Sequence, residues 1–419
     1  MPGTVFRASL RSNARYETRV FPEGNPRFTA NLAYAERVFK FLLWQRGGGR
    51  AYIGGPKRIG EQIRGCYSPT GARAFDCHFV GKEVYARPFT VIPCALADVP
   101  AEKESAISLG RHLDGCRIGF DLGAPDRKVV VAVDGKVVFS KEVVWESGVQ
   151  SDPEYHYREI IGALRRAASF MPRVDGIGGS AAGVYVGNKV RVSSLFRAVP
   201  AERYALVRDL FTRIDDEMGV PLVIVNDGDV TALSGALSLE KNGIFGIALG
   251  LSEAAGYVST EGTITGWLNE LAFVPIDHSP HAPRDELSGD RGCGAQYLSH
   301  QAVFRLARAS GIAVPGDLTP ADRLRFVQEL LEGGDERAAA IWQSIGVYLG
   351  YALVHYASFY EIDHLLILGR CTSGRGGRLL MDGARSVLQT EFSVLAERIC
   401  LHLQDARSRR IAAASLPDL

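Results

Sequence analysis

The sequence predicts an α/β protein of two related domains that enclose a cleft, preceded by an N-terminal extension of mixed character. Residues 116–227 and 228–393 each open with strand-like runs joined by a tight turn, and each continues with alternating helices and strands. This order is typical of α/β domains, in which ligands bind at the carboxyl ends of strands. A chain of 419 residues, 46% of them hydrophobic, is long and apolar enough for two or three such cores.

The extension, residues 1–115, combines helix and strand signals. Residues 31–47 have the apolar spacing of a helix, which the glycines at 47–49 end. Strand-like runs follow at 50–55 and at 88–100, the second ending in a proline-bounded exit.

Arginines recur every four residues at the start of the extension, at Arg7, Arg11, Arg15 and Arg19. On a helix this spacing would place all four on one face. The spacing marks a solvated face or a basic interaction module, or it is a coincidence, and no helix-turn-helix pattern accompanies it.

Composition argues against several classes of partner. The formal net charge of +1 gives no reason to expect nucleic acid or an anionic membrane. The longest apolar runs are far shorter than a membrane span, and the first residues lack the apolar core of a secretory signal. The seven cysteines are scattered without a CxxC pair, which fits reduced thiols. The sequence therefore predicts a soluble, cytoplasmic protein.

The first domain, 116–227, opens with three strand-like runs, and Asp134-Gly135 between the second and third is a hairpin signal. A helix, a strand, a second helix and a fully apolar strand complete it. The expected strands and helices lie at 116–123, 127–133, 136–145, 153–171, 174–183, 201–219 and 220–227.

The second domain, 228–393, repeats the theme with a helix, strands at 245–250 and 254–260 that a Glu261-Gly262 turn follows, longer helices, and a strand at 363–369 that runs into a glycine-rich turn. The chain closes with helix or tail, and we assign a C-terminal helix at 394–419 to the first domain.

Polar residues follow the apolar strand at 220–225. Asn226 and Asp227 stand at its carboxyl end, where a helix begins. Asp227 could accept a proton from a hydroxyl group while Asn226 orients that group. Alternatively Asn226, Asp227 or Asp229 caps the helix.

Two further segments have the character of anion-binding turns. Asp121 ends a strand before a glycine turn, so it could hold Mg²⁺ through water while the turn binds phosphate; an ordinary β-turn is the alternative. Glycines at 369, 374, 376 and 377 would let the backbone approach a planar or phosphorylated ligand, although no Walker motif is present.

The order of these three pieces resembles the ROK family of sugar kinases and sugar-responsive repressors, within the actin, hexokinase and Hsp70 ATPase superfamily. The resemblance spans roughly residues 116–395 and implies two ribonuclease H-like (actin-like ATPase) domains. In that family an early Asp-x-Gly-Gly-Thr hairpin binds phosphate, and Asp121 and Gly123 match it. The family's Asn-Asp pair contains a sugar contact and the catalytic base, and Asn226 and Asp227 match it.

The resemblance also implies roles for residues in the second domain. Gly250 and Ser252 lie in the place of the second phosphate loop, and Glu270 falls on the sugar-binding glutamate. Gly369 and Gly374 lie in the segment that resembles the adenosine loop. The implied partners are a small-molecule sugar and ATP with Mg²⁺, and homodimers are common in the family.

The phosphate loops depart from the family pattern. Pro125 stands where the family has threonine, and Leu251 and Ser252 replace a Thr-Gly pair. Ser252 could substitute as a hydroxyl donor, whereas we expect Glu253 to bring negative charge to the place where phosphates would lie. Lys128 and Arg127 could compensate for lost donors, although one of them must point away from the cleft.

The acceptor and zinc positions also differ. Phe273 replaces the histidine three residues after Glu270, and Ala295 stands at the usual second sugar-binding glutamate. The family's zinc site uses that histidine and three cysteines, but here Cys293 alone remains, with Glu286 and Ser288 at the other cysteine positions. One thiol cannot complete a structural zinc site, so no zinc is expected. His278, His281 and Cys293 are the residues from which a replacement metal site could be built.

The leading hypothesis is an ATP-dependent, Mg²⁺-requiring carbohydrate kinase in which Asp227 deprotonates a sugar hydroxyl that attacks the γ-phosphate. The alternative is a sugar-binding regulatory protein with the kinase fold and little or no turnover, whose extension is an interaction module. A third hypothesis keeps the kinase chemistry and changes the acceptor. Phe273 and Ala295 would make the pocket more apolar than a glucose site, which suits an acetylated, aminated or non-sugar polyol acceptor.

Overall fold

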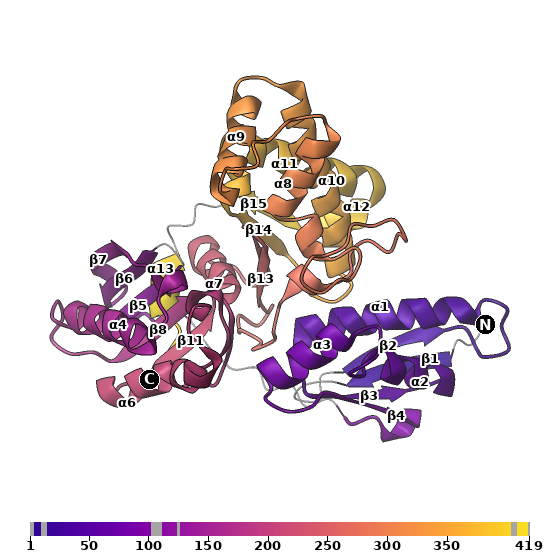
Figure 1. The fold of residues 1–419 in the computed structure, drawn as a ribbon, viewed down its shortest axis with the longest axis horizontal. Coiled ribbons are helices and arrows are strands. Elements are labelled where there is room, and N and C mark those ends of the chain that lie inside the picture. The colour runs from indigo at the N-terminus through magenta and orange to yellow at the C-terminus, as the bar shows by residue number, and fades with distance from the viewer. Residues whose placement is uncertain (1–3, 10–14, 102–110, 124–125, 404–408, 418–419) are drawn as a thin grey trace. The chain divides into compact units, whose positions relative to one another are not determined.

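The structure is a computed structural model, and it describes residues 4–9, 15–101, 111–123, 126–403 and 409–417. The chain divides into two compact units. The first joins residues 1–106 to 266–296, and the second joins 107–265 to 297–419. Figure 1 shows the elements of both units.

The first unit is built on a four-stranded sheet of order β2-β1-β3-β4. β1 pairs antiparallel with β2 and β3, while β3 pairs parallel with β4. Three helices and a π-helical turn (Phe79–Val84) complete this part of the unit. The strands are Thr4–Ser9, Arg15–Val20, Arg50–Gly54 and Thr90–Cys94, and the helices are α1 (Phe28–Arg46), α2 (Lys57–Cys66) and α3 (Ala74–His78).

Two features of the extension follow the sequence prediction. The predicted helix at 31–47 is α1, which ends at Gly47. Gly47 has a φ of 72°, a conformation that favours glycine, and its N–H donates to the carbonyl of Leu43. The two predicted strands are β3 and β4.

The prediction of a helical arginine face was wrong. Arg7 lies on β1 and pairs with Glu17 of β2, while Arg15 and Arg19 lie on β2. Arg11 lies outside the described residues. A four-residue repeat also keeps side chains on one face of a strand, whose period is two, so the spacing alone could not distinguish helix from strand.

The second unit begins with a five-stranded sheet of order β11-β8-β5-β6-β7. β5, β6 and β7 form an antiparallel meander, and β8 and β11 add in parallel to β5. Asp134 and Gly135 both have positive φ, so the predicted hairpin turn is confirmed. The elements are β5 (Cys116–Leu122), β6 (Asp126–Val133), β7 (Lys136–Val144), α4 (Pro153–Ala168), β8 (Gly176–Ala181), β9 (Val184–Val186), β10 (Lys189–Val192), α5 (Tyr204–Arg208), α6 (Leu210–Met218) and β11 (Leu222–Asn226).

A second sheet in this unit has the order β13-β12-β14-β15. β12 pairs antiparallel with β13 and parallel with β14, which pairs parallel with β15. The elements are α7 (Asp227–Leu239), β12 (Ile244–Leu249), β13 (Glu253–Val258), α8 (His300–Ala309), α9 (Pro320–Glu332), α10 (Glu336–Tyr356), β14 (His364–Leu368), α11 (Gly374–Glu391), α12 (Ser393–Arg398), β15 (Cys400–Leu403) and α13 (Arg409–Ala414).

The C-terminal segment is shared between the two sheets. β15 extends the second sheet, whereas α13 packs on β5, β6 and β8 of the first sheet and on α7. One buried apolar cluster accordingly includes residues of α7, β12, β14 and α13, with Val223 and Val225 of β11 packed against it. A separate cluster fills the α4 and α6 side of the first sheet. Among the helices of the described ranges, none has both the length and the hydropathy of a membrane span.

Candidate functional site

The first sheet brings three predicted site residues to one end of the sheet, at the carboxyl ends of its parallel strands. β5, β8 and β11 are parallel, and Leu122, Ala181 and Asn226 lie in one row across them. Because adjacent strands are about 4.8 Å apart, positions on β5 and β11 in such a row are about 10 Å apart. Asp121 and the Asn226-Asp227 pair therefore lie at the same end of the sheet.

Asp121 points to the α13 side of this sheet. Its neighbours Phe120 and Leu122 belong to the core on the α4 side, so alternation directs Asp121 to the other face. The strand beside it is closely covered there, because a Cβ on Gly178 would lie 1.7 Å from the carbonyl oxygen of Ala413 in α13. The sequence signal for this contact is the glycine-rich run at 176–179.

Asp121 and Ser180 are suited to holding Mg²⁺. They are direct neighbours in the β5–β8 register, and both side chains are buried. Ser180 Oγ has no hydrogen-bond partner. Carboxylate and hydroxyl oxygens are hard ligands, and Mg²⁺ usually keeps several waters and phosphate oxygens beside one or two carboxylates. Among the described residues, no group of three or more His, Cys, Asp or Glu could hold a metal ion.

The turn after Asp121 is closed by its own hydrogen bonds. The N–H of Gly123 donates to the carbonyl of Asp126 over 2.9 Å, and the indole of Trp145 donates to the carbonyl of Gly123 over 2.7 Å. Pro125, which replaces the family's threonine and its hydroxyl group, lies outside the described residues.

The basic pair that follows is neutralised by neighbouring acids. Lys128 lies opposite Asp121 in the β5–β6 register and forms an ion pair with Asp126 over 2.9 Å. Arg127 points to the other face and binds Glu159 of α4. Arg127 points away from the face of Asp121, so one residue of the pair points away as predicted. Both Arg127 and Lys128 are paired with acids, so neither is an unpaired cation that could replace a lost phosphate donor.

Asn226 holds the start of α7 in place. Its Oδ1 accepts from the N–H of Gly228 over 2.6 Å, and its Nδ2 donates to the carbonyl of Gly183 over 2.7 Å. Asn226 is thus the helix cap that the sequence left open as an alternative, and it also ties α7 to the turn after β8.

Asp227 is half-buried at the first residue of α7, where the helix dipole stabilises a negative charge. Burial raises the pKa of Tyr185, and the charge of Asp227 adds to this shift. Tyr185, on β9, is therefore a neighbour of the predicted base that sequence reasoning missed, because the short strand β9 carries no motif.

A glycine contact fixes the start of α7 on the second sheet. A Cβ on Gly256 of β13 would lie 2.1 Å from the carbonyl oxygen of Gly228, and one on Gly228 would lie 2.2 Å from the carbonyl oxygen of Ala255. Backbone therefore meets backbone directly, which only glycine permits. The contact holds Asp227 in a fixed relation to β13.

The second sheet brings the other predicted loops together. β12 and β14 are parallel, with Ala248 opposite Leu368, so Gly250 and Gly369 follow at the same edge. Gly369 has a φ of 116°, and a Cβ there would lie 2.4 Å from the carbonyl oxygen of Leu249. The N–H of Gly250 donates to the carbonyl of Ser252 over 3.0 Å, while the Ser252 side chain is exposed.

The expectation for Glu253 was wrong. Its side chain is 3% exposed and accepts a hydrogen bond from Tyr356 of α10 over 3.0 Å. Burial raises the pKa of Glu253 to about 8. It therefore adds little negative charge to the loop at neutral pH. Alternation along β13 turns Glu253 into the core although its neighbour Ser252 is exposed.

His300 is a further residue at this edge. The backbone N–H of His300 donates to the carbonyl of Gly250 over 2.9 Å. Its side chain is 3% exposed, and neither ring nitrogen has a hydrogen-bond partner. Burial and the charge of Arg370 lower the pKa of His300 to about 4, so the ring is neutral. Sequence reasoning missed it because a single histidine at a helix start carries no pattern.

Helices α9 and α10 bind the backbone of the segment that resembles an adenosine loop. Gln328 donates to the carbonyl of Arg370 over 2.8 Å, and Trp342 donates to the carbonyl of Cys371 over 2.7 Å. Glu332 Oε1 accepts from the N–H of Arg375 over 3.0 Å, beside Gly374 at the start of α11. A protein carboxylate thus occupies the helix end where a ligand anion would be favoured.

Glu270 belongs to the first unit. Its N–H donates to the carbonyl of Trp44 over 3.1 Å, and the N–H of Asn269 donates to the carbonyl of Gln45 over 3.0 Å. Phe273 packs on Trp44 with ring centroids 4.4 Å apart. The division of the chain into domains at residues 115, 227 and 393 stays a prediction, and the grouping of 266–296 with the extension was not foreseen.

The zinc positions do not fit a zinc ion. Cys293 is fully buried, and burial raises the pKa of its thiol to about 12. Its Sγ lies 3.9 Å from Ser288 Oγ, while Glu286 is exposed and Phe273 offers no donor atom. His278 and His281 are both exposed, so they do not share the buried environment of Cys293.

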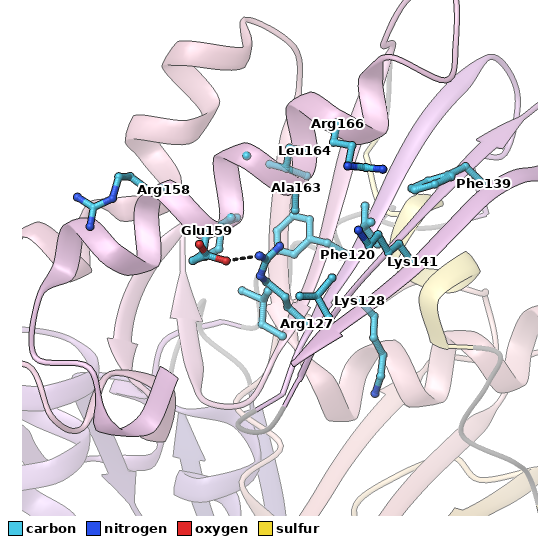
Figure 2. A pocket seen from close by; sticks show the side chains of 15 residues that line it. Phe120, Arg127, Lys128, Phe139, Lys141, Arg158, Glu159, Ala163, Leu164 and Arg166 are labelled. Carbon is cyan, nitrogen blue, oxygen red and sulfur yellow. Dashed lines mark hydrogen bonds and ion pairs between the residues drawn. The ribbon is translucent and has the colours of Figure 1, made fainter. Parts of the chain in front are cut away.

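A pocket of about 260 Å³ lies on the α4 side of the first sheet, opposite the face of Asp121. Phe120, Leu122 and Val129 contribute apolar lining, and Arg127 extends toward Glu159 (Figure 2). Figure 2 shows Lys128 directed away from Arg127 and Glu159. The pocket is therefore separate from the predicted site.

Solved structures share this arrangement of sheets. A ROK hexokinase from Thermus thermophilus has a TM-score of 0.57 and 19% identity, covering 71% of this chain and 96% of its own. A ROK family glucokinase from Streptomyces griseus, in complex with glucose and AMPPNP, has a TM-score of 0.54 and 20% identity over 72% of this chain and 98% of its own. The chain has the fold of the ROK proteins. This likeness confirms the predicted α/β fold class.

A regulator shares the ROK fold over more of the chain. A ROK family transcriptional regulator, a homolog of the E. coli MLC protein, has a TM-score of 0.55 and 18% identity and covers 92% of this chain and 95% of its own. That share includes part of the extension. No family model matches the sequence. No curated protein matches it either.

Proposed function

We propose that this chain is an ATP-dependent carbohydrate kinase of the ROK family, with Asp227 as general base. The observation that carries the proposal is the common sheet edge of Asp121, Asn226 and Asp227. Phosphoryl transfer depends mainly on positioning and electrostatics, so a base and a metal-binding carboxylate about 10 Å apart suit the two ends of the reaction.

In this mechanism Asp227 accepts the proton of a sugar hydroxyl, and Asn226 keeps the start of α7 in place through its bonds to Gly228 and Gly183. Glu270 binds other hydroxyl groups of the sugar. Asp121 and Ser180 would hold Mg²⁺, which when bound neutralises phosphate charge. Gly250, Ser252 and Gly369 would line the nucleotide side, with Gly123 and Gly374 in the flanking turns.

The acceptor need not be glucose. Phe273 packs on Trp44, and Ala295 is buried and has no polar side-chain atoms. Both positions offer less hydrogen bonding than a histidine and a glutamate would, which favours an acetylated, aminated or non-sugar polyol acceptor. We further expect a soluble cytoplasmic protein whose charge gives no reason to expect nucleic acid, and the resemblance to the family allows a homodimer.

The test is ADP release with a panel of hexoses, amino sugars and polyols, for the wild type and for Asp227→Asn. Loss of a general base lowers the turnover number by roughly 10²- to 10⁴-fold. Asp382→Asn is the matched control, because Asp382 is an exposed aspartate on α11 that pairs with Arg385. An unchanged rate of ADP release in Asp227→Asn would contradict the assignment of Asp227 as the general base.

A sugar-responsive regulatory protein is the second candidate. The contacts of α9 and α10 with residues 370–375 favour it, because they already use backbone groups that a nucleotide would need. The regulator with the ROK fold, which aligns with part of the extension, adds support. Isothermal titration with ATP and Mg²⁺ separates the two candidates. Micromolar binding favours the kinase, and no binding at millimolar ATP favours the regulator.

A further inference from the structure

Segment 266–296 is fastened to the end of helix α1 by backbone hydrogen bonds. The last carbonyls of a helix lack partners within the helix. Those of Trp44 and Gln45 accept the N–H groups of Glu270 and Asn269. The backbone N–H of Glu270, the predicted sugar-binding glutamate, is therefore hydrogen-bonded to a helix of the N-terminal extension.

A buried charge cluster makes a second connection between the same two parts of the chain. We define the Lys40 cluster as Glu36, Arg37, Lys40, Arg73, Asp76 and Asp290. Lys40 is 0% exposed, and its Nζ lies 2.6 Å from Oδ2 of Asp290 and 3.4 Å from Oδ1 of Asp76. Asp290 also pairs with Arg37 over 3.0 Å and with Arg73 over 2.5 Å. One carboxylate of the segment thus receives three cations of the extension.

The charges of the Lys40 cluster compensate one another. Burial would lower the pKa of Lys40, but Asp76 and Asp290 raise it above its usual value, so the ammonium group is charged. Burial would raise the pKa of Asp290, but Lys40 and Arg37 lower it. Burial raises the pKa of Asp76, which accepts a hydrogen bond from the Trp44 indole over 2.6 Å. Asp290 is therefore the ionised partner of Lys40.

An aromatic cluster lies beside these charges. Phe273 packs on Trp44, and its ring centroid lies 5.7 Å from that of Phe75 and 6.1 Å from that of Phe79. Phe273 is three residues from Glu270, so its packing restricts the turn that carries the glutamate. Trp44 connects the two clusters, because its indole N–H donates to Asp76 and its ring packs on Phe273.

We propose that the extension is a positioning element for Glu270, and that the Lys40 ammonium group, rather than a metal ion, organises segment 266–296. This inference rests on the proposed function for the role of Glu270, whereas the organising role of Lys40 stands on the contacts alone. Lys40, Trp44 and Asp290 are positioning residues, because they act through the segment. Cys293, whose charge state is coupled to Lys40, stays a neutral thiol in this arrangement.

Removing the ammonium group takes from Asp76 its ion-pair partner and leaves Asp290 with Arg37 and Arg73, which is unfavourable in a low-dielectric interior. The effect should be local, because all six residues of the Lys40 cluster lie in the first unit. The amides of 266–296 should then lose protection while those of β5 and β8 keep it.

Hydrogen exchange of the full-length chain tests this inference, comparing the wild type with Lys40→Met and with the milder, isosteric Asp290→Asn. We expect exchange at least tenfold faster in 266–296, including the Glu270 amide, and unchanged exchange in β5 and β8. Arg64→Met is the matched control, because Arg64 pairs with Glu61 on the exposed face of α2. It should leave 266–296 unchanged. If Lys40→Met fails to fold, so that β5 and β8 also lose protection, Asp290→Asn decides.

Two results would overturn the inference. One is unchanged protection of 266–296 in the variants. The other is faster exchange of this segment in the wild type on addition of the chelator 1,10-phenanthroline, which would show that a metal organises it. For a sugar that the wild type phosphorylates, Asp290→Asn should raise the sugar KM at least fivefold while the ATP KM stays constant. If the wild type phosphorylates no sugar, the proposed function fails, and the exchange data still test Lys40.

Discussion

The hydroxyl group of Tyr356 donates a hydrogen bond to Oε1 of Glu253 over 3.0 Å, in the core beside the second sheet. Both side chains are buried, and Oε2 of Glu253 has no partner. Burial raises the pKa of Glu253 to about 8, although the hydrogen bond from Tyr356 opposes the shift. A protonated acid in the core makes stability depend on pH.

We predict that the free energy of unfolding falls as pH rises from about 4.5 to about 8. Across this window the unfolded chain ionises Glu253 while the folded chain keeps it protonated, so the unfolded state binds fewer protons. The fall from this residue alone is about 1.4 kcal/mol per pH unit. Urea unfolding at several pH values measures it.

The matched variant is Glu253→Gln, which keeps an acceptor for Tyr356 and cannot ionise. We expect its pH profile to be flatter than that of the wild type between pH 5 and pH 8, and its stability to exceed that of the wild type at pH 8. Identical pH slopes in the two proteins would contradict a raised pKa at Glu253.

Asp121 should determine the requirement for Mg²⁺. If Asp121 holds the ion, Asp121→Asn raises the Mg²⁺ concentration for half-maximal turnover at least tenfold and leaves the sugar KM unchanged. Because Asp121 and Ser180 are neighbours, Ser180→Ala should give a smaller change in the same direction. A rise in the sugar KM without a change in Mg²⁺ dependence would place Asp121 on the acceptor side instead.

Glu332 should oppose nucleotide binding. Its carboxylate accepts from the N–H of Arg375 at the start of α11, where phosphates would otherwise be favoured. We predict that Glu332→Ala lowers stability by about 1 kcal/mol through loss of a helix-capping bond and lowers the Kd for ATP in calorimetry. Glu329→Ala, an exposed change on the same helix, is the control. Weaker ATP binding by Glu332→Ala would mean that the residue supports the loop for the nucleotide.

The contact between Gly228 and Gly256 should tolerate no side chain. Gly256→Ala places a Cβ 2.1 Å from the carbonyl oxygen of Gly228, so we expect a loss of about 1–3 kcal/mol in the free energy of unfolding. The control is Gly162→Ala within α4, where a Cβ meets nothing within 4 Å. That change should stabilise the chain by up to about 1 kcal/mol. Equal effects of the two substitutions would contradict the close contact.

Much of the first sheet could be predicted from local patterns. The Asp134-Gly135 turn, the apolar strands, and the polar pair at Asn226-Asp227 each depend on neighbours along the chain, and the structure has them as predicted. The sequence placed Asp121 and Asn226 each at the end of a strand, and the register of β5, β8 and β11 showed that they share one end of the sheet. The arginine repeat failed because its spacing suits both helix and strand.

The sequence by itself predicted the hairpin and the alternating strands and helices of 116–227, the ROK-like arrangement of loops and the strand-end position of the candidate base, but it missed strand β15 within the expected helix at 394–419. Tertiary structure alone decided that 266–296 joins the extension, that Glu253 turns into the core, and that α9 contacts the loop at 370–375. The reason is physical: periodicity and turn chemistry act between near neighbours, whereas Lys40 and Asp290 are 250 residues apart in the chain. Burial and charge compensation between such residues exist only after the chain has folded.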